Sequence, residues 1–211
     1  MWEWIHRINA IVLAVFIVVH LGVHATAIIS PEQHASSLAW MKQYYAHPRM
    51  EFLLLVSVFI QIVSGLMELK LVVHSVWRLI RNLTGLYLLV FMAIHVISVL
   101  LTRHVAAMPT DFYWIAGAFQ VEPLAPYAQA FYGLAVFSVF GHLLAALAAE
   151  WKAMPAWLHM IGWSMALATS LSIIMAFSGL FYFIDIPPEV EAGYEAWIED
   201  LSAWVDQLLL G

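Results

Sequence analysis

The chain has 211 residues, of which 64% are hydrophobic and only 10% are charged, with a formal net charge of −6 at pH 7. Soluble domains carry about 25% charged residues, so this composition excludes an ordinary soluble domain and indicates an integral membrane protein. The acidic balance gives no reason to expect nucleic-acid binding. The sequence contains no cysteine, which excludes disulfides, iron–sulfur ligation by this chain and thioether attachment of a cofactor.

The apolar residues fall into five long blocks, each near the roughly 20 residues that a helix needs to cross a bilayer. We expect spans at about 8–29, 52–72, 82–102, 127–149 and 159–184, separated by proline-marked loops and surrounded by membrane lipid. Blocks of this length favour helices over a β-barrel. The predicted fold class is therefore all-α, an integral membrane five-helix bundle over residues 1–186. Its first span ends in a small-residue pattern typical of signal peptides, but we expect it to be a permanent helix.

A separate amphipathic helix is predicted over residues 187–211, at the external surface. Hydrophobic residues recur there at steps of three and four, namely Val190, Tyr194, Trp197, Leu201, Trp204 and Leu208. The other face carries Glu191, Glu195, Glu199 and Asp206. The sequence leaves two interpretations open: a helix lying on the membrane, or an acidic docking face for a basic partner.

The distribution of Lys and Arg predicts the orientation. The loops and ends on the N-terminal side carry Arg7, Lys70, Arg78, Arg81 and Lys152, and the other side carries Lys42, Arg49 and Arg103. Because positive charge accumulates on the cytoplasmic side, we expect a cytoplasmic N-terminus and an external C-terminus. The expected location is a bacterial inner membrane, with several passes through it.

Two histidines at matched depth are the main functional signal. Shifting the chain by 75 residues (95 − 20) aligns two segments that both read Leu-x-x-Phe-x-x-x-His and end in His20 and His95. The first and third spans run in the same direction, so these histidines lie at one level. Histidine inside a membrane is costly without a partner, and facing imidazoles are common axial ligands of a b-type haem. We predict a haem b held by this pair; the alternative is that each ring only bonds to a neighbouring helix.

Two further histidines leave alternatives open. His24 lies one turn beyond His20 on the same face, so either is the ligand while the other contacts a haem propionate or a quinone. The His20–His24 spacing also suits a transition-metal clamp. His142 in the fourth span has no histidine partner in the second span, so a second haem stays open.

Glu51 begins the second span, where the helix dipole favours an acid. We also consider it as a proton acceptor in a quinone site. His47, Arg49 and Arg103 would then donate to haem propionates or to a quinone oxygen. The remaining histidines near span ends are expected at the membrane interfaces; these are His6, His34, His74 and His104.

Together these features resemble the membrane-anchor cytochrome b subunits of the succinate dehydrogenase and fumarate reductase superfamily, of the single-chain, five-helix kind. The resemblance covers about residues 5–183 and consists of the number of helices, the spacing of the loops and the placement of the histidines. It implies an outer haem ligated from the first and third spans, at His20 or His24 and at His95. It also implies an inner haem ligated from the second and fourth spans, where only His142 matches, and a functional glutamate at Glu51.

The resemblance further implies a non-catalytic electron-transfer and anchor subunit that exchanges electrons with membrane quinone. The catalytic partners would be a flavoprotein and an iron–sulfur protein on the cytoplasmic face. Two other hypotheses remain. One is a non-haem accessory or assembly subunit of a membrane complex, and the other is a metal-binding membrane protein built on His20 and His24.

Overall fold

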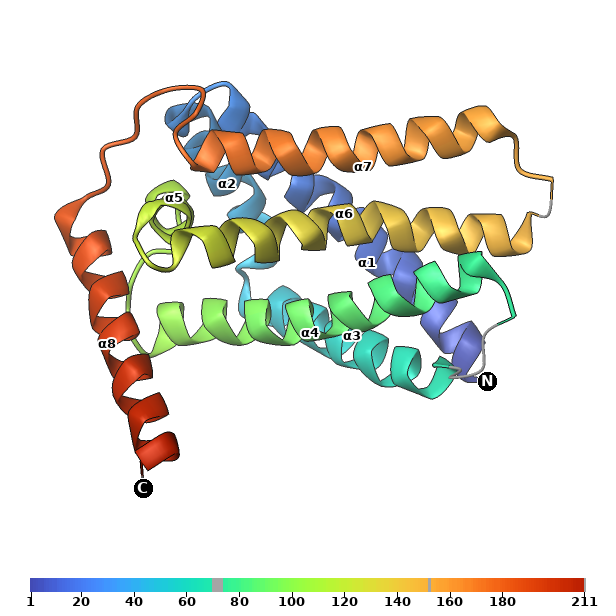
Figure 1. Cartoon of the computed structure of the whole chain (residues 1–211), viewed down its shortest axis with the longest axis horizontal. Helices are drawn as coiled ribbons and strands as arrows, with labels where there is room; N and C mark the ends of the chain where they lie inside the picture. The colour runs from blue at the N-terminus through green and yellow to red at the C-terminus, as the bar shows by residue number, and fades with distance from the viewer. Residues whose placement is uncertain (70–73, 152, 211) are drawn as a thin grey trace.

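The computed structural model describes residues 1–69, 74–151 and 153–210. Five helices in this part are long and apolar enough to cross a membrane: α1 (Trp2–Ala25), α3 (Pro48–Glu68), α4 (Val76–His104), α6 (Ala125–Glu150) and α7 (Ala156–Phe177) (Figure 1). The predicted all-α, five-span bundle is confirmed, and the chain is a multi-pass membrane protein whose apolar helices contact lipid. Lys70, Lys152 and the end of the second predicted span lie outside the described residues.

Two of the predicted loops are largely helical. The first holds η1 (Thr26–Ile28) and α2 (Pro31–Tyr45), and the other holds α5 (Phe112–Gln120). Side-chain caps explain where these helices begin: Ser30 accepts a hydrogen bond from the Gln33 backbone N–H at 3.1 Å, and Asp111 accepts one from Trp114 at 3.1 Å. Both capping residues are present in the sequence, but the two helices are shorter than a membrane span.

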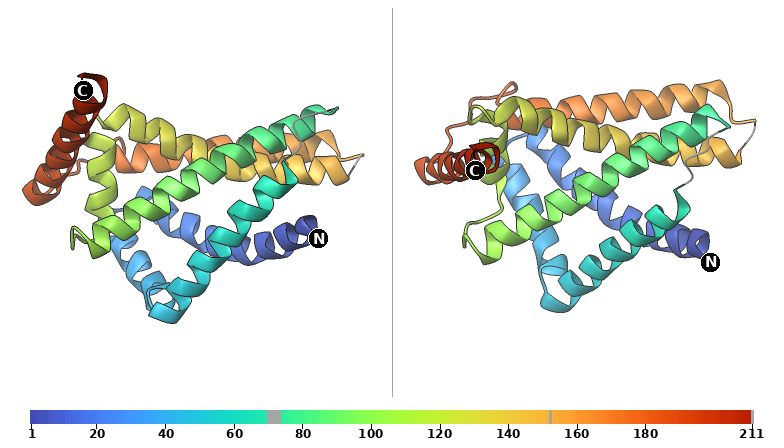
Figure 2. Two further views of the ribbon diagram at one scale, coloured as in Figure 1. Left: turned by 90° about the horizontal axis from the view of Figure 1, so that it is seen from below. Right: turned by 60° about the horizontal axis from the view of Figure 1, so that its bottom comes forward.

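The five spans form two groups. α4, α6 and α7 lie side by side in that order, and α1 packs along α3 behind them (Figures 1 and 2). The groups meet where α3 approaches α4 and where α1 and η1 approach α7. Within the described residues, the backbone of α1 does not come close to α4 or α6, so long side chains must bridge that distance.

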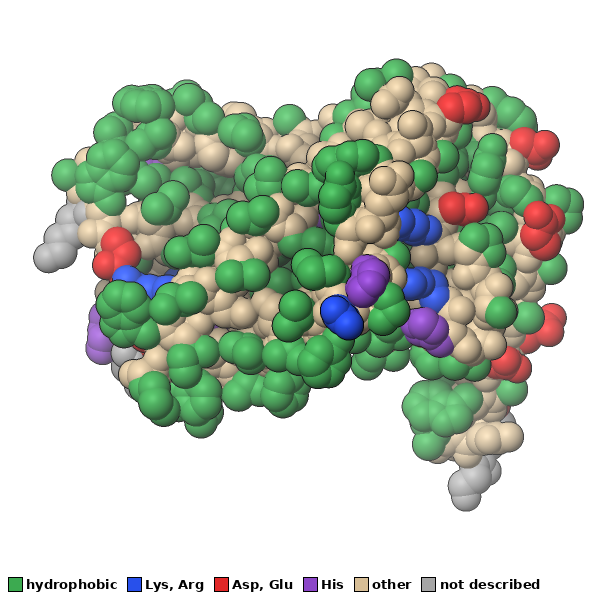
Figure 3. Space-filling view, turned by 180° about the vertical axis from the view of Figure 1, so that it is seen from behind, with side chains coloured by type: hydrophobic (Ala, Val, Ile, Leu, Met, Phe, Trp, Pro, Cys, Tyr) green, Lys and Arg blue, Asp and Glu red, His purple; other side chains and the backbone are tan. Residues whose placement is uncertain are grey.

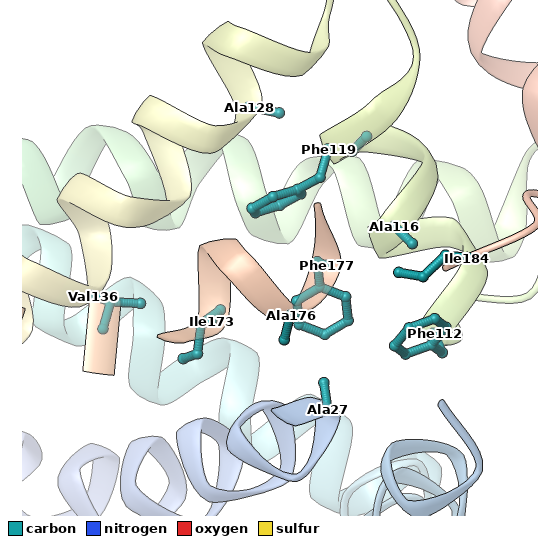
Figure 4. Packing of buried hydrophobic residues seen from close by; sticks show 11 residues of the cluster. Ala27, Phe112, Ala116, Phe119, Ala128, Val136, Ile173, Ala176, Phe177 and Ile184 are labelled. Atoms are coloured by element: carbon teal, nitrogen blue, oxygen red, sulfur yellow. The ribbon is translucent and has the colours of Figure 1, made fainter. Parts of the chain in front are cut away.

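The most densely packed region lies at the end of the bundle opposite the N-terminus, which we call the α8 end after α8 (Pro188–Leu210). Phe112, Phe119 and Phe177 come together there from α5 and α7, above Ala27 of η1 (Figure 4). Each of the three rings is at most 1% exposed. This cluster joins the two groups of spans and covers the polar residues described below.

Charged side chains gather at the two ends of the bundle, and hydrophobic side chains cover much of the length between them (Figure 3). At the N-terminal end, Arg7 forms ion pairs with Glu3 on its own helix and with Glu150 on α6. This distribution is the one that a bilayer requires, because lipid cannot solvate charges at mid-span.

Candidate functional site

The repeated sequence segments form the same local structure on α1 and α4. Phe16 stacks on His20, with ring centroids 5.4 Å apart and planes 15° apart, and Phe91 stacks on His95 at 5.3 Å and 9°. The two histidines then face each other between the two groups of spans, with ring centroids 6.1 Å apart. The structure therefore brings His20 and His95 together at one level, and we call them the outer pair.

The spacing of the outer pair fits a shared axial metal. Two imidazoles that each place a nitrogen about 2 Å from one iron have ring centres roughly 6 Å apart. Nδ1 of His95 is buried and has no hydrogen-bond partner in the described part of the chain. The pair thus has ring separation and unused hydrogen-bonding capacity that suit a bound ligand.

A chain of three imidazoles leads from the outer pair to α2. Nε2 of His24 lies 3.2 Å from Nε2 of His20, and Nε2 of His34 lies 3.3 Å from Nδ1 of His24. His34 was expected at the membrane interface; the structure shows that its side chain is fully buried in protein, between Phe112 and Phe177. Phe112 of α5 and Phe177 of α7 cover the ring, and the sequence did not indicate this contact.

The proton positions in this chain follow from the buried, unpartnered Nδ1 of His34. A buried N–H without an acceptor is costly, so the proton of His34 belongs on Nε2, which donates to His24. His24 then donates through Nε2 to Nε2 of His20. In this arrangement the hydrogen bond from His24 occupies one nitrogen of the outer pair, so ligation through that atom requires the bond to be released.

Burial lowers the pKa of His34 from 6.5 to about 4; nearby Asp111 raises it, and Lys42 lowers it further. Lys42 is itself held by a hydrogen bond of 2.9 Å from Nζ to the carbonyl oxygen of Thr110. The imidazole of His34 is therefore neutral at pH 7, as a hydrogen-bonded link in a buried chain requires.

A second pair forms at the N-terminal end, where the rings of His6 on α1 and His142 on α6 are 6.5 Å apart. We call these two the inner pair. His6 was expected to be interfacial, but it lies between helices, bonded to Ser64 at 3.1 Å and Gln61 at 3.2 Å on α3. The sequence contained a signal for it: His6 precedes His20 by fourteen residues, which places both on nearly the same face of α1.

Hydrogen bonds fix the tautomers of the inner pair. Nδ1 of His142 donates to the carbonyl oxygen of Arg81 at 3.0 Å. Ser64 donates its hydroxyl proton to Ile60, so its oxygen accepts from Nδ1 of His6. Both histidines therefore carry their proton on Nδ1 and have an unprotonated Nε2, the usual form of a metal-ligating imidazole. Nε2 of His6 accepts a hydrogen bond from the Gln61 amide at 3.2 Å, so ligation through that atom requires this bond to be released.

Two glycines make room for the inner pair. A Cβ atom at Gly85 on α4 would lie 2.9 Å from Cε1 of His142, and one at Gly65 on α3 would lie 3.3 Å from Cε1 of His6. The first distance is shorter than any normal contact, so the absence of a side chain at Gly85 lets His142 reach the α4 backbone.

Glu51 at the start of α3 is engaged in a half-buried ion pair. Its carboxylate lies 2.9 Å from an Arg103 guanidinium nitrogen and 3.8 Å from Nε2 of His104. His47 only caps α3, accepting from the backbone N–H of Arg49 at 3.3 Å, and both of these side chains are exposed. The structure thus joins Glu51 to Arg103 and leaves His47 and Arg49 at the surface.

The described residues contain no set of three or more His, Asp or Glu side chains arranged to hold a metal ion. His20, His24 and His34 instead form a line in which the middle ring uses a different nitrogen toward each neighbour. Comparisons with protein-family models, with curated proteins and with solved structures found no match to this chain. The functional argument therefore rests on the histidine geometry.

Proposed function

We propose that this chain is a b-type cytochrome membrane subunit that transfers electrons between haem and membrane quinone within a larger redox complex. The observation that carries the proposal is the pair of histidine contacts between α1 of one group of spans and α4 or α6 of the other, with ring separations of 6.1 and 6.5 Å. Both separations are close to the roughly 6 Å expected for two axial imidazoles of one iron.

The packing of α4 supports this proposal. Although α4 runs along α6, none of its residues is buried. A helix of 29 residues that turns a histidine toward α1 but has no fully buried residue leaves part of its surface for a planar group or a partner helix.

The chain's own residues would bind and orient the cofactor. His20 and His95 would hold one haem b, with Phe16 and Phe91 fixing the planes of their rings by stacking. We extend the proposal to a second haem b at His6 and His142, because their tautomers are already set. Bound haem would supply one-electron chemistry, which no protein side chain here provides.

The two pairs lie toward opposite sides of the bilayer. His6 and His20 are separated by about 21 Å along α1, at 1.5 Å rise per residue, within a hydrocarbon layer of about 30 Å. This arrangement supports a path for electrons across the membrane. Glu51 with Arg103 at the α8 end would bind a quinone there, with the carboxylate as proton acceptor.

The orientation in the membrane and the partner subunits are inferred from the charge distribution and from the family resemblance. The Lys and Arg distribution favours a cytoplasmic N-terminus and an external α8 end, in a bacterial inner membrane. The likeness to the succinate dehydrogenase and fumarate reductase anchors supports partner subunits, a flavoprotein and an iron–sulfur protein, at the cytoplasmic end. The chain itself would be a non-catalytic subunit of that oxidoreductase.

A haem assay tests the proposal directly. The purified protein should show a b-type reduced-minus-oxidised spectrum, and a pyridine haemochrome assay should give two haems per chain. A protein isolated from haem-replete cells without any haem would refute the proposed function. If the protein contained one haem per chain and the His95→Ala variant contained none, the single haem would belong to the outer pair. That result would refute the inner site and leave the outer site standing.

A second candidate function is a non-haem accessory subunit. The observation that favours it is the hydrogen-bonded line from His34 through His24 to His20, which satisfies these rings without a ligand. In that case the histidines would only join helices. The variants His24→Ala and His95→Ala would then lower thermal stability, while the spectrum would show no haem at any stage.

A further inference from the structure

Among the described residues, the contacts of helix α8 with the bundle are made by its first turns. Val190 is 5% exposed, and Val190 and Tyr194 pack around Gly117 of α5. Tyr194 also donates its hydroxyl proton to the carbonyl oxygen of Trp114 at 2.6 Å. These contacts tell us which face of α8 is turned toward the bundle.

The same face continues unpartnered along the rest of the helix. Trp197, Leu201, Trp204 and Leu208 follow Tyr194 at steps of three and four, and they are 44–63% exposed. Because positions at this spacing lie on one side of a helix, this stripe is turned in the same direction as Val190 and Tyr194. We call it the distal stripe.

The position of α8 shows what lies in that direction. The helix runs across the end of the bundle rather than along the spans, and its second half projects past the end of α4 (Figure 1). The first half rests on protein, whereas the second half extends beyond the protein at the level where the spans end. At that level the neighbour of a membrane protein is the lipid headgroup region of the same bilayer.

The charges of α8 agree with this direction. Glu191, Glu195, Glu199 and Asp206 lie on the opposite face, all exposed, and α8 contains no Lys or Arg. Acidic side chains appear along the outer edge of this end, away from the spans (Figure 3). Two tryptophans two turns apart on the inner side are typical of side chains that rest at a membrane interface.

We infer that the distal stripe of α8 lies in the headgroup region of a zwitterionic leaflet at the α8 end, as an interfacial arm that clamps the bundle to the bilayer surface. Its acidic face then points into water. Since carboxylates near an anionic surface are repelled, the arm would be weakened by anionic lipid and strengthened by salt. This inference rests on the five-span architecture and is independent of haem.

The absence of cysteine makes the test direct, because single cysteines can be labelled in the full chain. Leu201→Cys reports on the distal stripe, and Glu199→Cys, two residues away on the opposite face, is the matched control. Each variant carries a nitroxide label on its cysteine and is reconstituted in phosphatidylcholine nanodiscs that hold one copy of the protein. Collisions with oxygen, which partitions into lipid, are compared with collisions with a water-soluble nickel complex.

We expect the label at position 201 to collide mainly with oxygen and the label at 199 mainly with nickel. Equal access to nickel at both positions would overturn the inference, since the helix would then stand in water. Protection of position 201 from both reagents would also overturn it, because protein would be covering the stripe.

A second measurement tests the charge argument. Replacing phosphatidylcholine by phosphatidylglycerol should lower the oxygen-to-nickel ratio at position 201, and added salt should restore it. In the same background, the changes Glu191→Gln and Glu195→Gln should also restore the ratio. A ratio that is the same in both lipids would refute the claimed preference for zwitterionic lipid.

Discussion

The imidazole rings of His6 and His142 meet edge to face, 6.5 Å apart, although they come from the first and the fourth of the five spans. Each ring is held through Nδ1 by a different helix, His6 by α3 and His142 by α4. Four of the five spans are therefore tied together around one pair of unprotonated Nε2 atoms. The first prediction follows from this arrangement.

Replacing His142 by alanine should halve the haem content, because the inner site would lose one axial ligand while the outer pair stays intact. The pyridine haemochrome assay measures the loss. His104→Ala is the control, since that side chain is 60% exposed. A His142→Ala protein with unchanged haem content would show that this histidine only bonds between helices.

His24→Ala should keep the full haem content, whereas His95→Ala and His20→Ala should each lose the outer haem. The reason is that the ring of His24 is bonded to His20 and His34. Removing it frees Nε2 of His20 for ligation. Optical spectra and haem content of the three variants provide the measurement. If His24→Ala lost the haem and His20→Ala retained it, the ligand assignment would have to be reversed.

Glu51→Gln and Arg103→Gln should both lower the free energy of unfolding, by about 1 kcal/mol, because each leaves the other charge half-buried without its partner. Glu51→Gln should also lower the maximal rate of quinol oxidation, since the amide cannot accept a proton. Arg103→Gln, which loses a proposed contact to the quinone, should instead raise the KM for quinol more than it lowers the maximal rate. Thermal unfolding and quinol turnover separate the two effects. Equal maximal rates of quinol oxidation in the two variants would show that Glu51 has only a structural role.

Stability should decrease as the pH falls from about 6.5 to about 4, through the titration of His34. Its pKa is lowered from 6.5 to about 4 by burial, so in this window the unfolded chain binds a proton that the folded chain does not. The stabilising effect of the neutral ring is complete above pH 6.5. Thermal unfolding of a His34→Leu variant in detergent should show a smaller pH dependence in that window, and an identical dependence would contradict the prediction.

Gly117→Val should detach α8 from α5. A Cβ atom at this position would lie 2.7 Å from the Tyr194 ring and 2.9 Å from Val190, so the helix must move, at a cost of about 1–3 kcal/mol. Glutamyl endopeptidase should then cleave α8 faster, at Glu191 and beyond. Gly22→Val is the control, because the position of its Cβ has no neighbour within 4 Å.

The spans were predictable from the sequence because hydrophobic length alone determines them, and the repeated Phe and His positions did form matching stacks at Phe16–His20 and Phe91–His95. His34 was missed because its burial depends on contacts of α2 with Phe112 of α5 and Phe177 of α7, which are far away in the sequence. His6 was missed because it lies near the end of its span, where a histidine usually meets water. The partner of His142 was sought on the second span, but α3 supplies only the serine and glutamine that position His6.

The division of the spans into two groups has a consequence for biosynthesis. α1 and α3 follow each other in the chain and pair through the side chains of Asn9, Ser57 and Gln61, so this hairpin can assemble in the bilayer before α4 leaves the ribosome. The later spans α4, α6 and α7 can pair among themselves in the same way. In this order of assembly the two halves dock after each has formed, and the histidine contacts between them form at that step.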